Sequence, residues 1–423
     1  MAEGVFAPTP VYEMHVSRMR RRVRAIRRHA PAIVATMIMH RDSVAVDPRR
    51  VRRLLLVVLV VAALLGVTLG VSVTRADRLG ATMSNVASDG IGTGVSPGDV
   101  TELSSAQLTT MMQGIKSAGA TWVRLDVFWG QVESSKGSWN WTLPDKTIGA
   151  ALAAGLKPLL ILNGAFMPSW AISPPSAAQF TPFVEEAVTR YAAMGVHTYE
   201  VWNEPNLGSN WGGQASGAEY AAILIPAYNA IKAIDPGSFV ISGGLSPATD
   251  NYGNVDPGEF LTAMYAAGAG GHMDAVGIHP YSYPEDPTYP SQSNTFYDLP
   301  AYHQIMVANG DGGKQIWLTE FGIPTNVTGE STSIQAQQLS EAFTQLAQWS
   351  WTGPLFYFNW QDGQISQDFG LLDRSGNPKP AYAVFVAASA AKSNCGTACA
   401  PRSLRQSDGR RPEAHSLRAV RPE

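Results

Sequence analysis

Cysteine is scarce in this sequence. Only two occur in 423 residues, and both, Cys395 and Cys399, lie near the C-terminus. Two thiols in a C-x3-C spacing without a nearby histidine make a poor zinc site. A disulfide between them would close a very short loop, so it would add little stability. We therefore expect no structural zinc ion, and nothing else in the sequence indicates a metal or a cofactor.

Basic residues are scarce in the middle of the chain. Residues 80–391 contain 10 Lys and Arg against 26 Asp and Glu, although the whole chain has a net charge of only −3. The compensating positive charge lies in residues 1–79 and 392–423. A strongly acidic body repels phosphate groups, which argues against nucleic acid as a partner. The polar, Arg-rich segment 392–423 lacks aromatic residues and is typical of a disordered tail.

One long apolar run is present near the N-terminus. Leu54–Val73 contains 20 residues without a charge, enough to cross the hydrocarbon core of a bilayer. Several arginines between positions 49 and 53 precede it, which favours a cytoplasmic N-terminus and an exported body. The sequence Thr74-Arg75-Ala76 is also an acceptable cleavage site, so a cleaved signal peptide remains the alternative to a membrane anchor.

These features predict four parts. They are a basic cytoplasmic segment at residues 1–53, a transmembrane anchor or signal peptide at 54–73, a folded domain at 80–391, and the basic tail at 392–423. The folded domain is expected outside the cytoplasm, either held at the membrane by a single span or secreted after cleavage. All 11 tryptophans fall between positions 122 and 360, so a large core is available there.

Apolar strand-like runs alternate with helix-like segments throughout this domain. Eight strand candidates recur in about 300 residues, at Ile91–Val95, Thr121–Val127, Lys157–Leu162, His197–Val201, Phe239–Gly243, Met273–Ile278, Gln315–Thr319 and Leu355–Asn359. Such alternation is typical of parallel βαβ units, and eight of them predict an α/β fold of the (β/α)8 TIM barrel type. An open doubly wound sheet is the alternative, but no G-x-G-x-x-G or P-loop sequence opens a helix.

Two glutamates follow or end strand candidates at the same edge of the predicted barrel. Glu204 lies in "YEVWNEPN", where Pro205 lacks an N–H group and ends the fourth strand. Glu320 lies in "IWLTEFGIP", at the end of the seventh. In a TIM barrel the carboxyl ends of the strands form the active-site face. Two carboxyl groups that face each other there are what glycoside hydrolysis requires.

These motifs resemble those of retaining β-glycosidases of glycoside hydrolase clan A, which includes the family 39 glycosidases and the family 5 cellulases. The resemblance of "WNEPN" implies that Glu204 is the general acid/base, and that of "TEFG" implies that Glu320 is the nucleophile. It covers about residues 90–390 and five motifs in the same order, the last of them "GLLDRSGNPKPAYAVF" at Gly370–Phe385. It implies an O-glycosyl hydrolase that cleaves β-linked poly- or oligosaccharides with retention of configuration.

The resemblance also implies a set of substrate-binding residues. "VRLDVFWGQVE" places Arg124 near the nucleophile, and "GIHPYS" places His279 and Tyr281 at the site. Asn203 could bind a sugar 2-hydroxyl, a contact that strengthens in the transition state.

Three further residues follow from strand position and chemistry. Trp360, after the last strand, and Trp129, after the second, offer flat faces on which a sugar could stack. Glu200, four residues before the acid, is expected to be a buried partner of Arg124.

The acid must carry a proton at the working pH. We expect the nearby anionic Glu320 and apolar surroundings to keep Glu204 protonated.

Two other functions are compatible with the same site residues. One is a non-catalytic barrel that binds cell-wall polysaccharide, and the other is a transglycosylase. The sequence thus predicts a carbohydrate partner and a membrane contact through Leu54–Val73, with no nucleic-acid partner.

Overall fold

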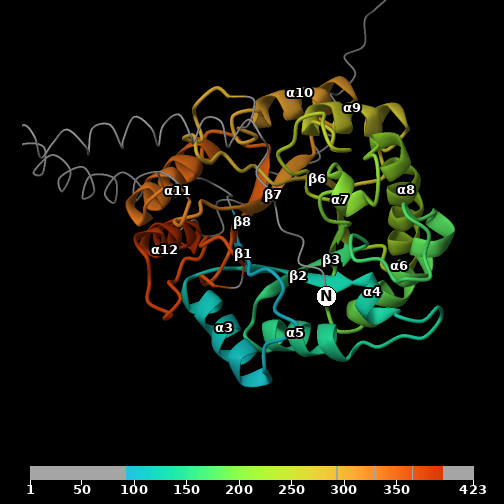
Figure 1. The fold of residues 1–423 in the computed structure, drawn as a ribbon, viewed down its shortest axis with the longest axis horizontal. Helices are drawn as coiled ribbons and strands as arrows, with labels where there is room; N and C mark the ends of the chain where they lie inside the picture. Colours follow the sequence, from blue (N-terminus) through green and yellow to red (C-terminus); the bar gives the residue numbers. More distant parts are fainter. Residues whose placement is uncertain (1–91, 292–293, 328–329, 364, 394–423) are drawn as a thin grey trace, which may run out of the picture.

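A computed structural model describes residues 92–393 of the chain, except 292–293, 328–329 and 364. Eight parallel strands close into a barrel in the order of the sequence, because β1 pairs with both β2 and β8 (Figure 1). The predicted (β/α)8 barrel is therefore confirmed. The strands are β1 (Thr93–Ser96), β2 (Trp122–Phe128), β3 (Lys157–Asn163), β4 (Thr198–Val201), β5 (Phe239–Ser242), β6 (Ala275–Ile278), β7 (Gln315–Phe321) and β8 (Thr352–Phe358).

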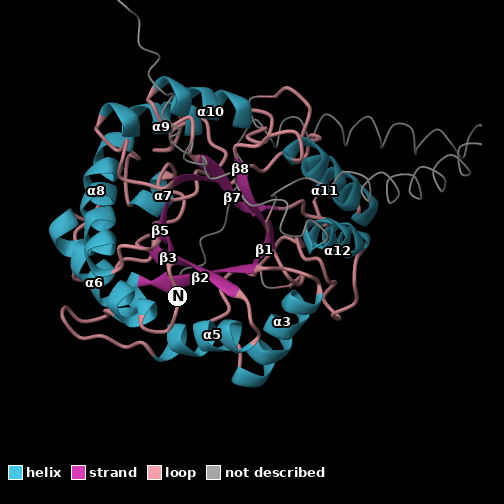
Figure 2. Cartoon of the chain, turned by 180° about the vertical axis from the view of Figure 1, so that it is seen from behind, coloured by secondary structure: helices cyan, strands magenta, loops and turns pink. Residues whose placement is uncertain are grey.

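Helices surround the strands on the outside, as Figure 2 shows. They are α3 (Ser105–Ser117), α4 (Trp129–Val132), α5 (Thr142–Ala153), α6 (Ala177–Ala192), α7 (Gly208–Trp211), α8 (Gly217–Ile234), α9 (Pro257–Ala266), α10 (Leu299–Ala308), α11 (Thr332–Leu346) and α12 (Pro380–Ser393). Side chains of the sequence set several of their starts. Ser104 and Gln107 form a capping box at α3, and Asp256 accepts two backbone N–H bonds at the start of α9.

The apolar core has two layers. A large cluster lies between the strands and the helices, and a smaller one consists of residues from five different strands: Leu159, Ile241, Ala275, Trp317 and Phe356. No helix contributes to the smaller cluster, so it fills the interior of the barrel. Because parallel strands are buried on both faces, their sequences read as continuous apolar runs.

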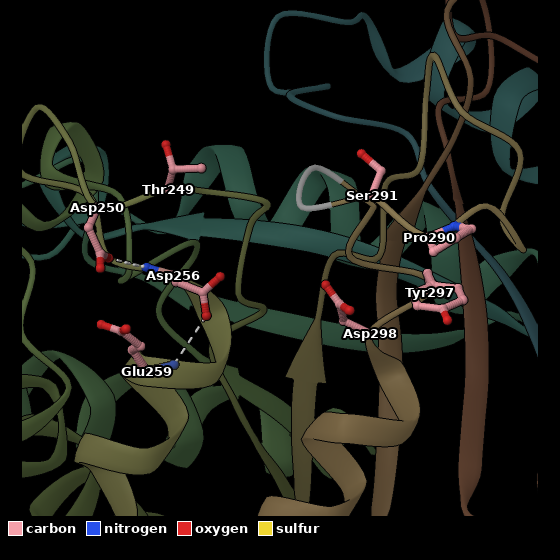
Figure 3. Close-up of a pocket in the computed structure, with 8 residues that line it drawn as sticks. All are labelled: Thr249, Asp250, Asp256, Glu259, Pro290, Ser291, Tyr297 and Asp298. Atoms are coloured by element: carbon pink, nitrogen blue, oxygen red, sulfur yellow. Dashed lines mark hydrogen bonds between the residues drawn. The ribbon is translucent and has the colours of Figure 1, made fainter.

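The segments after β5 and β6 form the walls of a cavity of about 560 Å³ (Figure 3). Its lining includes four carboxyl groups, those of Asp250, Asp256, Glu259 and Asp298. Two of these groups stabilise the local chain, since Asp250 accepts the backbone N–H of Asp256 and Asp256 caps α9. Neither Glu204 nor Glu320 lines this cavity.

The predicted segments 1–53 and 54–73 lie outside the described residues, as do both cysteines and the tail beyond residue 393. Within the described part of the chain, none of the helices combines the length and the apolarity that crossing a bilayer requires.

Candidate active site

Arg124 of β2 is the centre of a buried polar cluster in the half of the barrel nearer the carboxyl ends of the strands. Its Nε and Nη2 atoms donate to the two oxygens of Glu200 at 2.7 and 3.0 Å. Nη2 also donates to Asn203 Oδ1 at 2.7 Å, and Nη1 donates to Glu320 Oε1 at 2.5 Å and Ser96 Oγ at 3.4 Å. All five N–H groups of the guanidinium therefore have acceptors. The predicted contact between Arg124 and a buried Glu200 is confirmed.

The charge of this guanidinium is stable. Burial opposes it, but the carboxylates of Glu200 and Glu320 outweigh that effect and raise the pKa of Arg124. Arg124 is 2% exposed and Glu200 is fully buried. The arginine thus supplies a permanent positive charge beneath Glu320.

Glu204 stands on a tight turn that follows β4. Trp202 and Glu204 both adopt left-handed backbone conformations, with φ of 75° and 49°. The indole of Trp202 is fully buried and lies against Gly164, where an added Cβ would come within 1.9 Å of it. Its Nε1–H donates to the carbonyl of Asn210 in α7 at 3.2 Å. These contacts stabilise the turn, and the turn directs the Glu204 side chain away from the line of β4.

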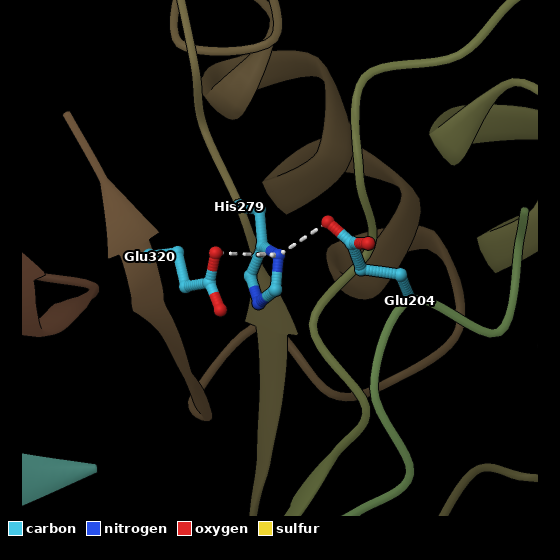
Figure 4. A group of neighbouring side chains, drawn as sticks. All are labelled: Glu204, His279 and Glu320. Atoms are coloured by element: carbon cyan, nitrogen blue, oxygen red, sulfur yellow. Dashed lines mark hydrogen bonds and ion pairs between the residues drawn. The ribbon is translucent and has the colours of Figure 1, made fainter. Parts of the chain in front are cut away.

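The two glutamates face each other across the barrel mouth with His279 between them (Figure 4). The Nδ1 atom of His279 lies 3.0 Å from Glu204 Oε1 and 3.7 Å from Glu320 Oε2. One carboxylate oxygen from each glutamate and a ring nitrogen of His279 all lie within 4.8 Å of one another. Asn210 Nδ2 donates to Glu204 Oε2 at 3.0 Å, and the Tyr281 hydroxyl donates to Glu320 Oε2 at 2.8 Å.

The surroundings of His279 define its protonation. Its Nε2 atom lies 3.3 Å from Arg124 Nη2, which can only donate, so Nε2 bears no proton. The Nδ1 atom then carries the hydrogen and donates it to Glu204. The ring is fully buried and packs against Gly244, where an added Cβ would come within 2.2 Å of Nε2. His279 is therefore a neutral, fixed donor to the Glu204 carboxylate.

The pKa of Glu204 differs from the expectation from the sequence. Burial raises it, but the hydrogen bonds from His279 and Ser246 and the positive charge of Arg124 hold the pKa of Glu204 below its ordinary value. The expectation that the nearby Glu320 and apolar surroundings keep Glu204 protonated is thus wrong, because the contacts around Glu204 favour its ionised form. By contrast, burial and the charge of Glu320 raise the pKa of Tyr281, so its hydroxyl keeps its proton and donates.

Glu204, His279 and Glu320 have the mutual spacing of metal ligands. However, the guanidinium of Arg124 already binds Glu320, and the His279 Nδ1 atom that faces both carboxylates carries a proton. The arrangement therefore suits proton transfer and attack by a carboxylate better than it suits binding of a cation.

A family model described as cellulase (glycosyl hydrolase family 5) matches residues 84–355, which is more than half of the chain. The chain belongs to glycosyl hydrolase family 5. None of the curated proteins compared with it matches significantly.

Solved structures share the fold of this family 5 protein. They include a family 39 glycoside hydrolase from Bacteroides cellulosilyticus WH2, with 22% identity and a TM-score of 0.56 over 72% of this chain and 64% of that one. A monomeric β-xylosidase from Caulobacter crescentus CB15 has 21% identity and a TM-score of 0.53, over 70% and 67% of the two chains. The exo-β-1,4-mannosidase of Opitutaceae bacterium strain TAV5 has 18% identity and a TM-score of 0.55, over 72% and 60%. The family 5 chain thus spans less than two thirds of the length of the family 39 glycoside hydrolase.

The structure brings six of the eight predicted site residues of this family 5 protein into one connected cluster. They are Glu204, Glu320, Arg124, Asn203, His279 and Tyr281.

The two tryptophans are not part of it. Trp129 is fully buried against Phe180 in the helix layer, and Trp360, 5% exposed, packs between Gly114 of α3 and Tyr382 of α12. Neither indole presents a face to the mouth, so the expectation that they stack on sugar is wrong for this structure. The residues are at the ends of the expected strands, but their side chains point outward.

Sequence reasoning missed three polar residues of the site. Asn210 holds Glu204 from the one-turn helix α7, which carries no clear sequence signal. Asp126 and Asn163 lie at the ends of β2 and β3 and are hydrogen-bonded to each other. Asp126 could have been found, because it follows Arg124 by two residues and so faces the same side of the strand.

Proposed function

We propose that this chain is a retaining glycoside hydrolase that cleaves β-linked poly- or oligosaccharides, with Glu320 as the nucleophile and Glu204 as the general acid/base. One observation carries the proposal. Oxygens of the two carboxylates lie within 4.8 Å of each other, with Arg124 bound to one glutamate and His279 to the other. Retaining enzymes hold their carboxyl groups about 5–5.5 Å apart, whereas inverting enzymes need about 6.5–9.5 Å to admit a water.

In the first step Glu320 attacks the anomeric carbon while the bond to the leaving oxygen breaks and that oxygen takes the proton of Glu204. Arg124 binds one oxygen of Glu320 at 2.5 Å, and Tyr281 binds the other at 2.8 Å. These two contacts hold the Glu320 carboxylate in one orientation for attack.

In the second step Glu204, now ionised, takes a proton from water as the water attacks the glycosyl-enzyme and releases Glu320. The N–H of His279 stabilises the ionised Glu204, which favours this half of the cycle. The first half needs a proton on Glu204. A bound sugar excludes solvent from both glutamate side chains, which are only 14% and 12% exposed without it. This desolvation disfavours two adjacent carboxylates and so favours protonation of one.

A transglycosylase is the second candidate, since it forms the same intermediate and differs only in the acceptor that attacks it. A non-catalytic polysaccharide-binding barrel is disfavoured by the charge network, because binding alone does not require the pairing of Glu320 with Arg124 and of Glu204 with His279.

We also propose that the barrel works outside the cytoplasm, anchored through Leu54–Val73 or released after Ala76. The uncharged run and its flanking arginines support this location. A reporter fused after residue 80 should be active on the outer side of the membrane, and activity only in the cytoplasm would contradict the proposal.

The catalytic proposal is tested with a panel of aryl β-glycosides that includes the xyloside, mannoside and glucoside, since the fold relatives include a β-xylosidase and an exo-β-1,4-mannosidase. Proton NMR of the first product should show the retained β anomer. An inverted product, or no hydrolysis of any substrate in the panel, would refute the mechanism.

Two variants separate the roles of the glutamates. With a good leaving group, Glu204→Ala should form the glycosyl-enzyme and stall, and added azide should give a β-azide product. Glu320→Ala should lose activity on all substrates, and azide should then give the α-azide product. The matched control is Glu186→Ala, which removes an exposed glutamate of α6 and should leave activity unchanged. Exchange of the two azide outcomes would show that the roles are reversed.

A further inference from the structure

We propose that Asp126 and Asn163 together bind hydroxyl groups of the sugar unit that Glu320 attacks, and so determine which sugar the site accepts. The inference deepens the function proposed above and rests on it for the placement of the sugar. Neither residue belongs to the cluster around Arg124 that serves the two glutamates.

The position of the pair follows from strand geometry. β2 and β3 are neighbours, and Arg124 and Asp126 are two residues apart on β2, so both side chains point into the barrel. Asp126 lies nearer the carboxyl end of its strand, and Asn163 is the last residue of β3. The pair therefore lies above Arg124, at the edge where active sites of this fold are found.

The hydrogen bonds fix the orientation of both groups. Asn163 Nδ2 donates to Asp126 Oδ1 at 2.7 Å, and Asn163 Oδ1 accepts the backbone N–H of Ala165 at 2.9 Å. Since the Oδ1 atom of Asn163 is occupied by a backbone donor, its amide cannot be turned round. Among the residues that the structure describes, none donates to the other oxygen of Asp126, Oδ2.

Within the described part of the chain, no cationic side chain donates a hydrogen bond to Asp126. All five N–H groups of Arg124 are taken by other residues, as described above. The charged groups that face Asp126 are Arg124 on its own strand, Glu320 on β7 and Asp99 before α3. Burial, with the charges of Glu320 and Asp99 and against those of Arg124 and the Asn163 hydrogen bond, raises the pKa of Asp126 to about 6.

A half-buried carboxylate whose pKa is raised and whose second oxygen receives no hydrogen bond from the described residues is a candidate for ligand binding. A sugar hydroxyl supplies the missing donor. Its O–H group can donate to Asp126 Oδ2, while the second N–H of Asn163 Nδ2 donates to the oxygen of an adjacent hydroxyl. One acceptor and one donor side by side recognise two neighbouring hydroxyls in a defined orientation.

The geometry of the proposed reaction brings such hydroxyls to the pair. A sugar whose anomeric carbon meets Glu320 and whose 2-hydroxyl meets Asn203 lies over Arg124, because Arg124 binds both of these side chains. Its remaining hydroxyls then extend towards the ends of β2 and β3. An epimer that turns one hydroxyl away leaves Asp126 without a donor, which is a strong basis for discrimination.

Asp126→Asn is the test variant, because it keeps the shape and removes the charge. With aryl β-glycosides as substrates, kcat/KM for the preferred sugar should fall at least about tenfold, and the preference among epimers should weaken. The Tm at pH 7.5 should stay the same or rise, since an unpaired carboxylate is removed. Wild-type KM should rise as pH falls through about 6, whereas the variant should lack this dependence. Glu185→Gln, at an exposed position of α6, is the matched control.

Binding separates failure of this inference from failure of the proposed function. In a Glu320→Ala background, calorimetry with xylobiose, cellobiose and mannobiose measures affinity without hydrolysis. Adding Asp126→Asn should weaken the tightest of these complexes at least about tenfold, even if the wild-type protein hydrolyses none of the aryl glycosides. Two results would overturn the inference. One is that the double variant binds the disaccharides with affinities and a sugar preference within twofold of those of Glu320→Ala alone. The other is that Glu320→Ala binds none of the disaccharides.

Discussion

Replacement of Arg124 by methionine should be among the most destabilising single changes in the barrel. Methionine keeps an unbranched apolar stem but has no donor. Among the described residues, it leaves the fully buried Glu200 with only the N–H of Gly244 at 2.8 Å and the hydroxyl of Thr319 at 3.2 Å as donors. Breaking a buried ion pair on one side costs about 3–5 kcal/mol. A domain of ordinary stability has about 5–15 kcal/mol in total, so the loss is a large fraction of it.

A double variant identifies the cause. If the unpaired Glu200 carboxylate is responsible, Arg124→Met combined with Glu200→Gln should be more stable than Arg124→Met alone, by about 1 kcal/mol or more. The surface pair of Arg190 and Asp145 is the control. Its side chains are 41% and 32% exposed, so Arg190→Met should cost about 1 kcal/mol or less.

Urea unfolding at pH 7, followed by tryptophan fluorescence, measures these differences, since all the tryptophans lie within the barrel sequence. Two results would refute the reasoning. One is a cost for Arg124→Met no larger than that of Arg190→Met. The other is strict additivity of the changes at Arg124 and Glu200, within about 0.5 kcal/mol, which would mean that the two side chains are not coupled.

Two further predictions concern the turn that carries the acid. Asn210→Asp should move the alkaline limb of the kcat/KM profile upward, because a like charge replaces a donor 3.0 Å from Glu204 Oε2 and favours the protonated acid; an unmoved limb would contradict this role. Gly164→Ala should lower stability by about 1–3 kcal/mol and kcat at least tenfold, since the new Cβ would lie 1.9 Å from the Trp202 ring. Gly149→Ala in α5, with open space at its Cβ, should instead be neutral or stabilising, and similar losses in both would count against the steric argument.

The barrel could be predicted because its strands are buried on both faces and read as apolar runs. Boundary errors occur at both ends of the strands, and those at the carboxyl ends of β3 and β7 affect the site. Lys157–Leu162 was expected where β3 extends to Asn163, and Gln315–Thr319 where β7 extends to Phe321. The added residues include the polar Asn163 and Glu320, which an apolar pattern excludes. Strands of this fold continue into the site, so the functional residues are the ones that hydrophobic periodicity fails to assign.

The cluster around the two glutamates was predictable to the extent that residue spacing determines it. Position along a strand gives the height of a side chain in the barrel, which is enough for Glu200, whereas the place of Arg124 was implied by the family resemblance. Position along a strand no longer applies after the strand ends. Trp129 and Trp360 both follow a strand, and there the direction of the side chain depends on tertiary packing against Phe180 and Tyr382. Predictions about sugar stacking failed for this reason.

The protonation of the site depends on directions of hydrogen bonds, which no sequence pattern contains. Four carboxyl groups feel the charge of one guanidinium, that of Arg124; they are those of Glu200, Glu204, Glu320 and Asp126. Its five N–H groups donate to four side chains, those of Glu200, Asn203, Glu320 and Ser96. His279 therefore faces it with an unprotonated nitrogen, and Asp126 receives no hydrogen bond from it. Negative charge is therefore in excess around the guanidinium. A neutral substrate rich in hydroxyl donors relieves that excess without adding charge, and this is the property by which the site would select a sugar over an anionic ligand.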